Sequence, residues 1–135
     1  MRITIGPHRH AVMVVDDDRS TREALEVLLT THGYEVISVE DAEHGLAAAD
    51  ENRDCCLVLL DWRMRGLGGE GFLRRRKDVP SLADLPVVIL SGQELTGAEA
   101  KAAGASAFLR KPMDPTILLG IVEHECRTHA GLQAG

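Results

Sequence analysis

A run of four apolar residues that ends in a carboxylate constrains this chain more than any other feature. Leu57-Val58-Leu59-Leu60 contains no polar alternate, and Asp61 follows it directly. An unbroken apolar run is typical of a strand buried on both faces, in the middle of a parallel sheet covered by helices. In open α/β sheets, ligands bind in the crevice outside the carboxyl ends of the strands. Asp61 is therefore the first candidate functional residue.

Three other apolar runs deliver a polar group in the same way. They are Val12-Met13-Val14-Val15 before Asp16-Asp17-Asp18, Val87-Val88-Ile89-Leu90 before Ser91, and Ala107-Phe108-Leu109 shortly before Lys111-Pro112. Because the carboxyl ends of parallel strands share one edge of the sheet, we expect carboxylates, a hydroxyl and an ammonium to converge on Asp61.

Helical patterns separate these strands. Ser20-Thr21-Arg22-Glu23 has the spacing of a capping box, which predicts that the first helix begins there. The remaining expected elements are a strand at 34–39 and helices at 42–50, 71–78, 98–103 and from Asp114-Pro115 onward. The alternation βαβαβαβαβα predicts one α/β domain, with a five-stranded parallel sheet and helices on both of its faces.

Taken together, these motifs resemble the receiver domains of two-component response regulators. VVDDD, LVLLDWRM, VVILSG and FLRKP occur in that order, each at a predicted strand, and extend from about Val12 to about Glu125. The resemblance implies a CheY-like, flavodoxin-like (βα)5 fold. We therefore expect a receiver domain over residues 11–127, an N-terminal leader over 1–10 and a C-terminal tail over 128–135.

The resemblance also implies a phosphoacceptor with a magnesium ion. Asp61 would be the nucleophile that takes the phosphoryl group. Mg²⁺ would bind Asp17, Asp61 and the main-chain carbonyl of Arg63, with Asp16 acting through an ordered water. Carboxylates that crowd around one point repel each other unless a hard divalent cation lies between them.

Three more residues would respond to the phosphoryl group. Lys111 would balance the charge of its oxygens, and the family's Lys-Pro peptide bond, here Lys111-Pro112, is typically cis. Ser91 would donate its hydroxyl to one oxygen. Phe108 matches the family's switch aromatic, and plain core packing is the alternative role for its ring.

Several positions depart from the family pattern or flank the site. Arg65 stands where receivers usually carry proline, which predicts a more mobile loop after Asp61. Trp62, the only tryptophan, is interpreted as an exposed ring or a partner contact. We expect Trp62, Arg65 and Gln93 to modulate the site.

Composition excludes several classes of function. The formal net charge of −6 argues against non-specific binding of nucleic acid, which rests on lysines and arginines. The basic run Arg74-Arg75-Arg76-Lys77 is interpreted as a solvated helix face, with a phosphate-binding patch as the alternative. No apolar run approaches the roughly 20 residues of a transmembrane helix, so no membrane insertion is expected.

The cysteines indicate a reducing compartment. Cys55, Cys56 and Cys126 make an odd count without C-x-x-C spacing, which predicts neither a disulfide framework nor a zinc site. Cys55 and Cys56 are expected to be small buried hydrophobes. A cytoplasmic protein is the simplest interpretation.

The expected function is phosphorylation-dependent signalling by a stand-alone receiver, and not enzymatic turnover. A sensor histidine kinase or histidine phosphotransfer protein would supply the phosphoryl group. The face made by the fourth helix, fifth strand and fifth helix would contact a target protein. Alternatives are a phosphorylation-independent adaptor with the same fold, or a receiver fragment of a longer regulator with an effector domain.

Two enzyme or cofactor classes fit poorly. A haloacid-dehalogenase-type phosphatase needs a second acid two residues after the nucleophile, and Arg63 stands there. A dinucleotide-binding domain needs G-x-G-x-x-G after its first strand, which this chain lacks.

Overall fold

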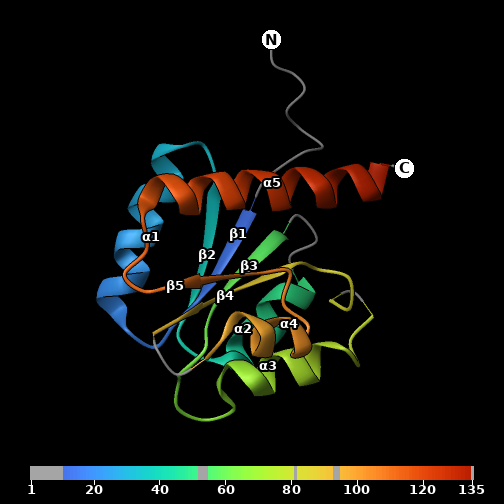
Figure 1. The fold of residues 1–135 in the computed structure, drawn as a ribbon. Helices are drawn as coiled ribbons and strands as arrows, with labels where there is room; N and C mark the ends of the chain where they lie inside the picture. The colour runs from blue at the N-terminus through green and yellow to red at the C-terminus, as the bar shows by residue number, and fades with distance from the viewer. Residues whose placement is uncertain (1–10, 52–54, 81, 93–94, 135) are drawn as a thin grey trace.

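Five parallel strands form a single sheet in the order β2-β1-β3-β4-β5 (Figure 1). The computed structural model describes residues 11–51, 55–80, 82–92 and 95–134, with side chains through Cys126. The strands are β1 (Ala11–Val15), β2 (Glu35–Val39), β3 (Cys55–Asp61), β4 (Val87–Ser91) and β5 (Ala107–Arg110). The helices are α1 (Arg19–Thr31), α2 (Ala42–Glu51), α3 (Gly68–Arg76), α4 (Gly97–Ala102) and α5 (Pro115–Ala134). The predicted fold class is confirmed.

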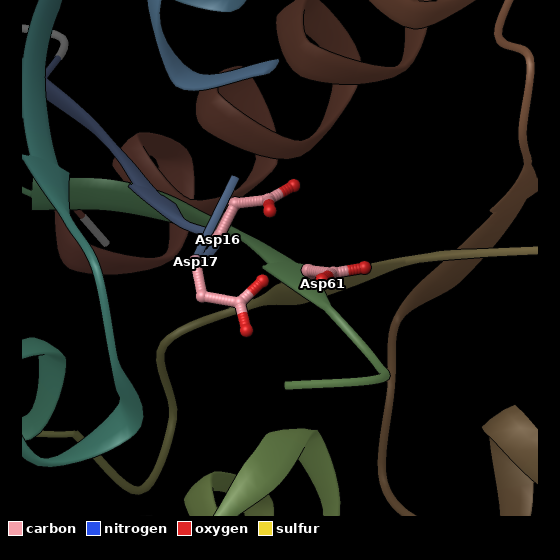
Figure 2. A group of neighbouring side chains, drawn as sticks. All are labelled: Asp16, Asp17 and Asp61. Carbon is pink, nitrogen blue, oxygen red and sulfur yellow. The ribbon is translucent and has the colours of Figure 1, made fainter. Parts of the chain in front are cut away.

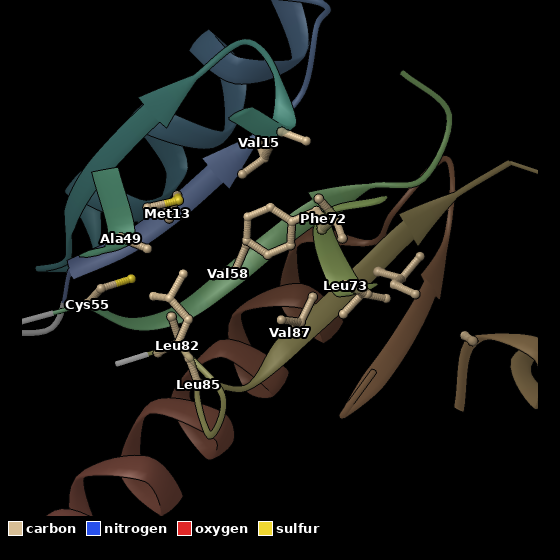
Figure 3. Close-up of a cluster of buried hydrophobic side chains, with 14 of the residues drawn as sticks. Met13, Val15, Ala49, Cys55, Val58, Phe72, Leu73, Leu82, Leu85 and Val87 are labelled. Carbon is tan, nitrogen blue, oxygen red and sulfur yellow. The ribbon is translucent and has the colours of Figure 1, made fainter. Parts of the chain in front are cut away.

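The sheet is covered on both faces, with α1 and α5 on one side and α2, α3 and α4 on the other (Figure 1). All seven residues of β3 are buried. Val58 and Leu60 belong to the core beneath α2 and α3, which Figure 3 shows, while Leu57 and Leu59 belong to the core beneath α1 and α5. Successive side chains of a strand point to opposite faces, so a central strand needs apolar residues at every position.

Gly45 lets α2 pack closely on this core. A Cβ atom at Gly45 would lie 3.2 Å from a Val15 methyl group and 3.3 Å from the ring of Phe72, which is fully buried. Interiors are close-packed, so a larger residue would force α2 away from the sheet.

The N-cap of the first helix lies two residues before Ser20, the first residue of the predicted capping box. Asp18 is the N-cap of α1, because its carboxylate accepts the backbone N–H of Thr21 at 3.2 Å and also the Thr21 hydroxyl. A capping box does occur at α4, where Thr96 and Glu99 each accept the other's backbone N–H. It fixes the start of a helix of only six residues.

The last helix is longer than the sequence suggests. Asp114 accepts the backbone N–H of Thr116 at 2.8 Å, so α5 begins at Pro115 as predicted. It continues to Ala134, through most of the expected tail, whereas the expected leader lies outside the described residues. None of the described helices is long and apolar enough to cross a membrane.

Arg76 is not part of a solvated face. Its guanidinium is buried and donates to the carbonyl oxygens of Leu82, Leu85 and Gly104 at 2.8 to 3.2 Å, and to that of Ala83. Arg74, Arg75 and Lys77 are exposed, so the interpretation holds for three of the four basic residues. Arg76 differs from its neighbours because it lies four residues after Phe72 and three after Leu73, on the buried face of α3.

The expectation that no cysteine forms a disulfide is wrong. Cys56 on β3 and Cys126 on α5 are bonded, with their Cα atoms 5.0 Å apart. Cys55 is free and buried, as expected, and burial raises the pKa of its thiol. The two bonded residues are 70 positions apart, and only the packing of α5 across the sheet brings them together.

Candidate functional site

Three carboxylates meet at the carboxyl edge of the sheet (Figure 2). Asp61 ends β3, and Asp16 and Asp17 follow directly after β1, the neighbouring strand. One oxygen from each lies within 4.8 Å of the others. Asp16 and Asp61 are buried, with 1% and 6% of their surface exposed, and Asp17 is half-buried. The structure thus brings these three carboxylates together, as the sequence predicts.

The backbone around Asp16 fixes its carboxylate. The Asp16 N–H donates to the Val39 carbonyl at 3.2 Å, and the Asp16 carbonyl accepts the guanidinium of Arg22 at 2.8 Å. Oδ1 of Asp16 accepts the N–H of Asp18 at 2.8 Å. Oδ2 is buried and has no hydrogen-bond donor among the described residues. A buried charged oxygen without a donor is costly, so it favours a cation nearby.

Lys111 supplies one such cation. Its ammonium Nζ lies 2.9 Å from Oδ1 of Asp61 and 3.5 Å from Oδ2 of Asp16. The Lys111-Pro112 peptide bond is cis, as the resemblance implies. The Lys111 N–H donates to the Ser91 carbonyl at 2.7 Å, which ties the lysine to the end of β4.

Burial and neighbouring charges shift the pKa values of both Asp61 and Lys111. Burial raises the pKa of Asp61 to about 6, the charge of Asp16 adds to the shift, and the hydrogen bond from Lys111 opposes it. Burial disfavours the charged form of Lys111 as well. The carboxylates of Asp61 and Asp16 outweigh that effect, so the pKa of the Lys111 ammonium is raised. Lys111 therefore stays a cation at neutral pH, while the Asp61 carboxyl takes up a proton more readily than a free aspartate does.

Ser91 lies on β4, the neighbour of β3, and Phe108 lies on β5, the edge strand beyond β4. Ser91 is the last residue of β4 and is fully buried, and its Cα pairs with that of Arg110 on β5. Phe108 pairs with Ile89 and is half-buried against the core beneath α4. Ser91 therefore lies at the same edge of the sheet as Asp61, and Phe108 lies further back, on β5.

The residues after Asp61 contact both the core and the carboxylates of the site, and the expected mobility of this loop stays a prediction. The Trp62 ring is half-buried and packs on the core, and a Cβ atom at Gly69 would lie 2.8 Å from it. Trp62 is thus not a fully exposed ring. The Arg65 N–H donates to Oδ2 of Asp17 at 3.4 Å, and its Nε lies 3.8 Å from the same oxygen. Arg65 therefore places an exposed positive charge at the mouth of the site.

Two other expected positions are placed less firmly. The Arg63 side chain is exposed, and the role of its main-chain carbonyl stays a prediction. Gln93 lies outside the described residues.

The carboxylate cluster fits a hard divalent cation. Three carboxylates offer oxygen ligands, and within the described part of the chain no hydrogen-bond donor reaches the buried Oδ2 of Asp16. Mg²⁺ prefers oxygen ligands and is typically held by one or two carboxylates while keeping several waters. Asp17 is only half-buried, so water can reach its carboxylate.

The surface also has a groove away from the carboxylate cluster. An apolar groove of about 590 Å³ runs between α1 and the start of α5, lined by residues such as Leu25, Leu28, Met113 and Leu118. It contains none of the clustered carboxylates. The reactive groups therefore lie at the sheet edge and not in this groove.

Two arginines near the site escape analysis of the sequence alone. Arg22 holds the Asp16 carbonyl, and Arg110 donates to the carbonyl oxygens of Gly92 and Leu95. Arg110 stands directly before Lys111, and this adjacency was the only signal for it in the sequence.

Comparison with known proteins agrees with this geometry. Residues 12–123 match the family described as the response regulator receiver domain. The chain is 32% identical over 111 residues to the phosphate regulon transcriptional regulatory protein PhoB of Pseudomonas aeruginosa, covering 80% of this chain and 48% of PhoB. It is 35% identical over 116 residues to the response regulator PleD of Caulobacter vibrioides, covering 82% of this chain and 25% of PleD.

A solved structure matches nearly end to end. The chemotaxis protein CheY4 of Vibrio cholerae superimposes with a TM-score of 0.78 at 28% identity, over 87% of this chain and 98% of CheY4. By contrast, the chain spans about half of the length of PhoB and a quarter of that of PleD.

Proposed function

This chain belongs to the receiver domains of two-component response regulators, and from that premise we propose that it accepts a phosphoryl group on Asp61. The observation that carries the proposal is the position of Asp61. Its buried carboxylate lies 2.9 Å from the Lys111 ammonium and within 4.8 Å of two further carboxylates. The donor would be a phosphohistidine on a sensor histidine kinase or on a histidine phosphotransfer protein.

The transfer is a substitution at phosphorus. An Asp61 oxygen forms the new O–P bond while the P–N bond to the histidine breaks, and the imidazole keeps the electron pair and takes up a proton. Lys111 holds Asp61 in place and neutralises the charge that remains on the phosphoryl oxygens. Ser91, at the end of the adjacent strand, would donate its hydroxyl to one of these oxygens.

A divalent cation completes the charge balance. Asp16, Asp17, Asp61 and the main-chain carbonyl of Arg63 would hold Mg²⁺, directly or through water. When bound, the ion would neutralise phosphoryl oxygens as the O–P bond forms. The two basic groups nearest this cluster, Lys111 and Arg65, would compete with the ion for carboxylate oxygens.

Signalling would follow from a shift between two conformations. Phosphoryl oxygens draw Ser91 and Lys111 inward, and the face formed by α4, β5 and α5 changes shape for a target protein. The half-buried ring of Phe108 lies on this face and would serve as the switch aromatic. Neither nucleic acid nor insertion into a membrane has a role in this proposal.

Alternative assignments differ in what they require of Asp61. A phosphorylation-independent adaptor needs only the fold, and Arg65 at the mouth of the site favours it. A receiver that is part of a longer regulator would act through an effector domain, as the length of PhoB and PleD suggests. A stand-alone, cytoplasmic receiver remains the proposal, although the Cys56–Cys126 disulfide weakens the argument for a reducing compartment.

The test is covalent phosphate on Asp61. The protein is incubated with Mg²⁺ and a small phosphodonor such as acetyl phosphate, and its intact mass is measured alongside Trp62 fluorescence. We expect one added phosphoryl group in the native protein, none in Asp61→Asn, and an unchanged result in Asp78→Asn, an exposed carboxylate at the end of α3. A native protein that responds neither to Mg²⁺ nor to the donor would favour the adaptor.

A further inference from the structure

The Arg110 side chain contacts Gly92, Leu95 and Phe108 at once. Its guanidinium donates to the Gly92 carbonyl at 2.6 Å and to the Leu95 carbonyl at 3.3 Å. The same group lies over the ring of Phe108, with its carbon 5.2 Å from the ring centroid. One side chain of β5 therefore joins the Phe108 ring to the backbone of Gly92 and of Leu95.

The strand geometry explains these contacts. Phe108 and Arg110 are two residues apart on β5, so their side chains lie on the same face of the sheet. Arg110 pairs with Ser91 in the register of β4 and β5, which puts its guanidinium beside the residues that follow Ser91. The planar guanidinium presents several N–H donors at fixed angles, so it can reach two carbonyl oxygens and still cover a ring.

These contacts lead directly to the proposed phosphoacceptor. Gly92 follows Ser91, and Arg110 precedes Lys111. The Ser91 carbonyl accepts the Lys111 N–H at 2.7 Å, and the Lys111 ammonium lies 2.9 Å from Asp61. The ends of β4 and β5 are thus joined twice, by the backbone hydrogen bond from Lys111 to Ser91 and by the side-chain hydrogen bond from Arg110 to Gly92.

We propose that Arg110 is a positioning residue that holds Gly92 and Leu95, and through Gly92 also Ser91, in place relative to Asp61 and Phe108. The proposal rests on the proposed function and deepens it, because it names what sets the position of the Ser91 hydroxyl. The guanidinium keeps its charge at every physiological pH and a backbone carbonyl does not titrate, so these hydrogen bonds do not depend on pH in that range.

The first test needs no phosphoryl group. In Arg110→Ala, amide hydrogen exchange of Gly92, Leu95 and Thr96 should be about fivefold faster or more, while amides of β1 and β3 keep their rates. Arg74→Ala removes an exposed arginine of α3 and is the matched control, with native rates throughout. Native exchange at 92–96 in Arg110→Ala overturns the proposal.

The second test separates positioning from general damage. Affinity for beryllium fluoride, which mimics the phosphoryl group, is measured in the presence of Mg²⁺. Arg110→Ala should weaken it about fivefold with Mg²⁺ affinity within about twofold of native, and the loss should disappear in a Ser91→Ala background, since coupled residues are not additive. An equal loss in that background, or an equal loss of Mg²⁺ affinity, overturns the proposal.

More conservative variants at position 110 allow the test even if Arg110→Ala does not fold. Arg110→Lys retains the charge over Phe108 but reaches only one carbonyl, so it should give an intermediate affinity. Arg110→Gln replaces Arg110→Ala if the latter does not fold. If the native protein binds no beryllium fluoride, the proposed function fails, and the exchange rates alone decide whether Arg110 holds Gly92 and Leu95.

Discussion

The ammonium of Lys111 lies 2.9 Å from the Asp61 carboxylate and 3.5 Å from that of Asp16, so one cation bridges the ends of two strands. Asp17, the third carboxylate, has the Arg65 guanidinium 3.8 Å away. The negative charges at this edge are therefore only partly balanced by the protein. The excess makes the site a source of instability when a cation is not bound, and this has measurable consequences.

The first consequence concerns pH and Asp61. Its folded pKa is raised from 3.8 to about 6, so between these values the folded protein binds more protons than the unfolded chain. Stability must then fall as pH rises from about 4 to about 6 through this group. We expect Asp61→Asn, which cannot ionise, to be more stable than the native protein at pH 8 by about 1–3 kcal/mol.

Urea unfolding without divalent cations at pH 4 and pH 8 measures this difference. The advantage of Asp61→Asn should shrink at pH 4, where the native carboxyl is largely protonated in the folded state. Asp78→Asn is the control for loss of a carboxylate elsewhere. An Asp61→Asn protein less stable than the native one at pH 8 would show that the Lys111 contact outweighs the burial of Asp61.

The second consequence concerns Mg²⁺. A ligand that binds only the folded state stabilises it, by about 1.4 kcal/mol at ten times its dissociation constant. We expect the thermal midpoint of the native protein to rise by a few degrees in saturating Mg²⁺ and to return after chelation. Asp17→Asn and Asp61→Asn should lose most of this rise, whereas Asp78→Asn should keep it. An equal rise in all variants would indicate non-specific ion binding.

The third consequence concerns Arg65. Its guanidinium competes with a divalent cation for Asp17, so Arg65→Ala should bind Mg²⁺ about two- to threefold more tightly at low ionic strength. The gain should fade in about 1 M salt, because the side chain is exposed and salt screens exposed charges. Trp62 fluorescence follows the titration, and Arg74→Ala is the control. Weaker binding in Arg65→Ala would mean that Arg65 holds Asp17 in its binding position.

Arg65→Pro addresses the loop itself. Proline fixes φ and has no N–H to donate to Asp17. If the departure from the family pattern loosens this loop, the proline variant should change the rate at which the phosphoryl group is lost. The same rate and the same kinase preference as in the native protein would contradict that expectation.

The features that the sequence predicts well are those that one strand and its end determine. The all-apolar run before Asp61 can be buried only between two layers of helices, and that requirement places its carboxylate at the ligand edge. Asp16, Ser91 and Lys111 follow by the same reasoning. Each prediction needs only the order of residues within one segment.

The features it misses depend on the reach of side chains between segments. The disulfide joins residues 70 positions apart, and the Arg76 guanidinium binds carbonyl oxygens of the segment after α3 together with that of Gly104, which is 28 positions away. Arg110 is exposed, and only the register of β4 and β5 shows that it lies beside Gly92. Local pattern holds no information on any of these contacts.

Arg76 gives the last prediction. Its guanidinium satisfies the carbonyl oxygens of Leu82, Ala83 and Leu85 before β4, and that of Gly104 before β5. Arg76→Met fills much of the same volume but leaves these buried acceptors without donors, each of which costs about 1–3 kcal/mol unless water reaches it. We expect a loss of about 2–4 kcal/mol in the free energy of unfolding, measured by urea titration. The adjacent Arg75→Met, on the exposed side of α3, should change stability by less than about 0.5 kcal/mol. Equal effects of the two substitutions would mean that water replaces the guanidinium at these carbonyls, so that Arg76 does not hold the ends of β4 and β5 together.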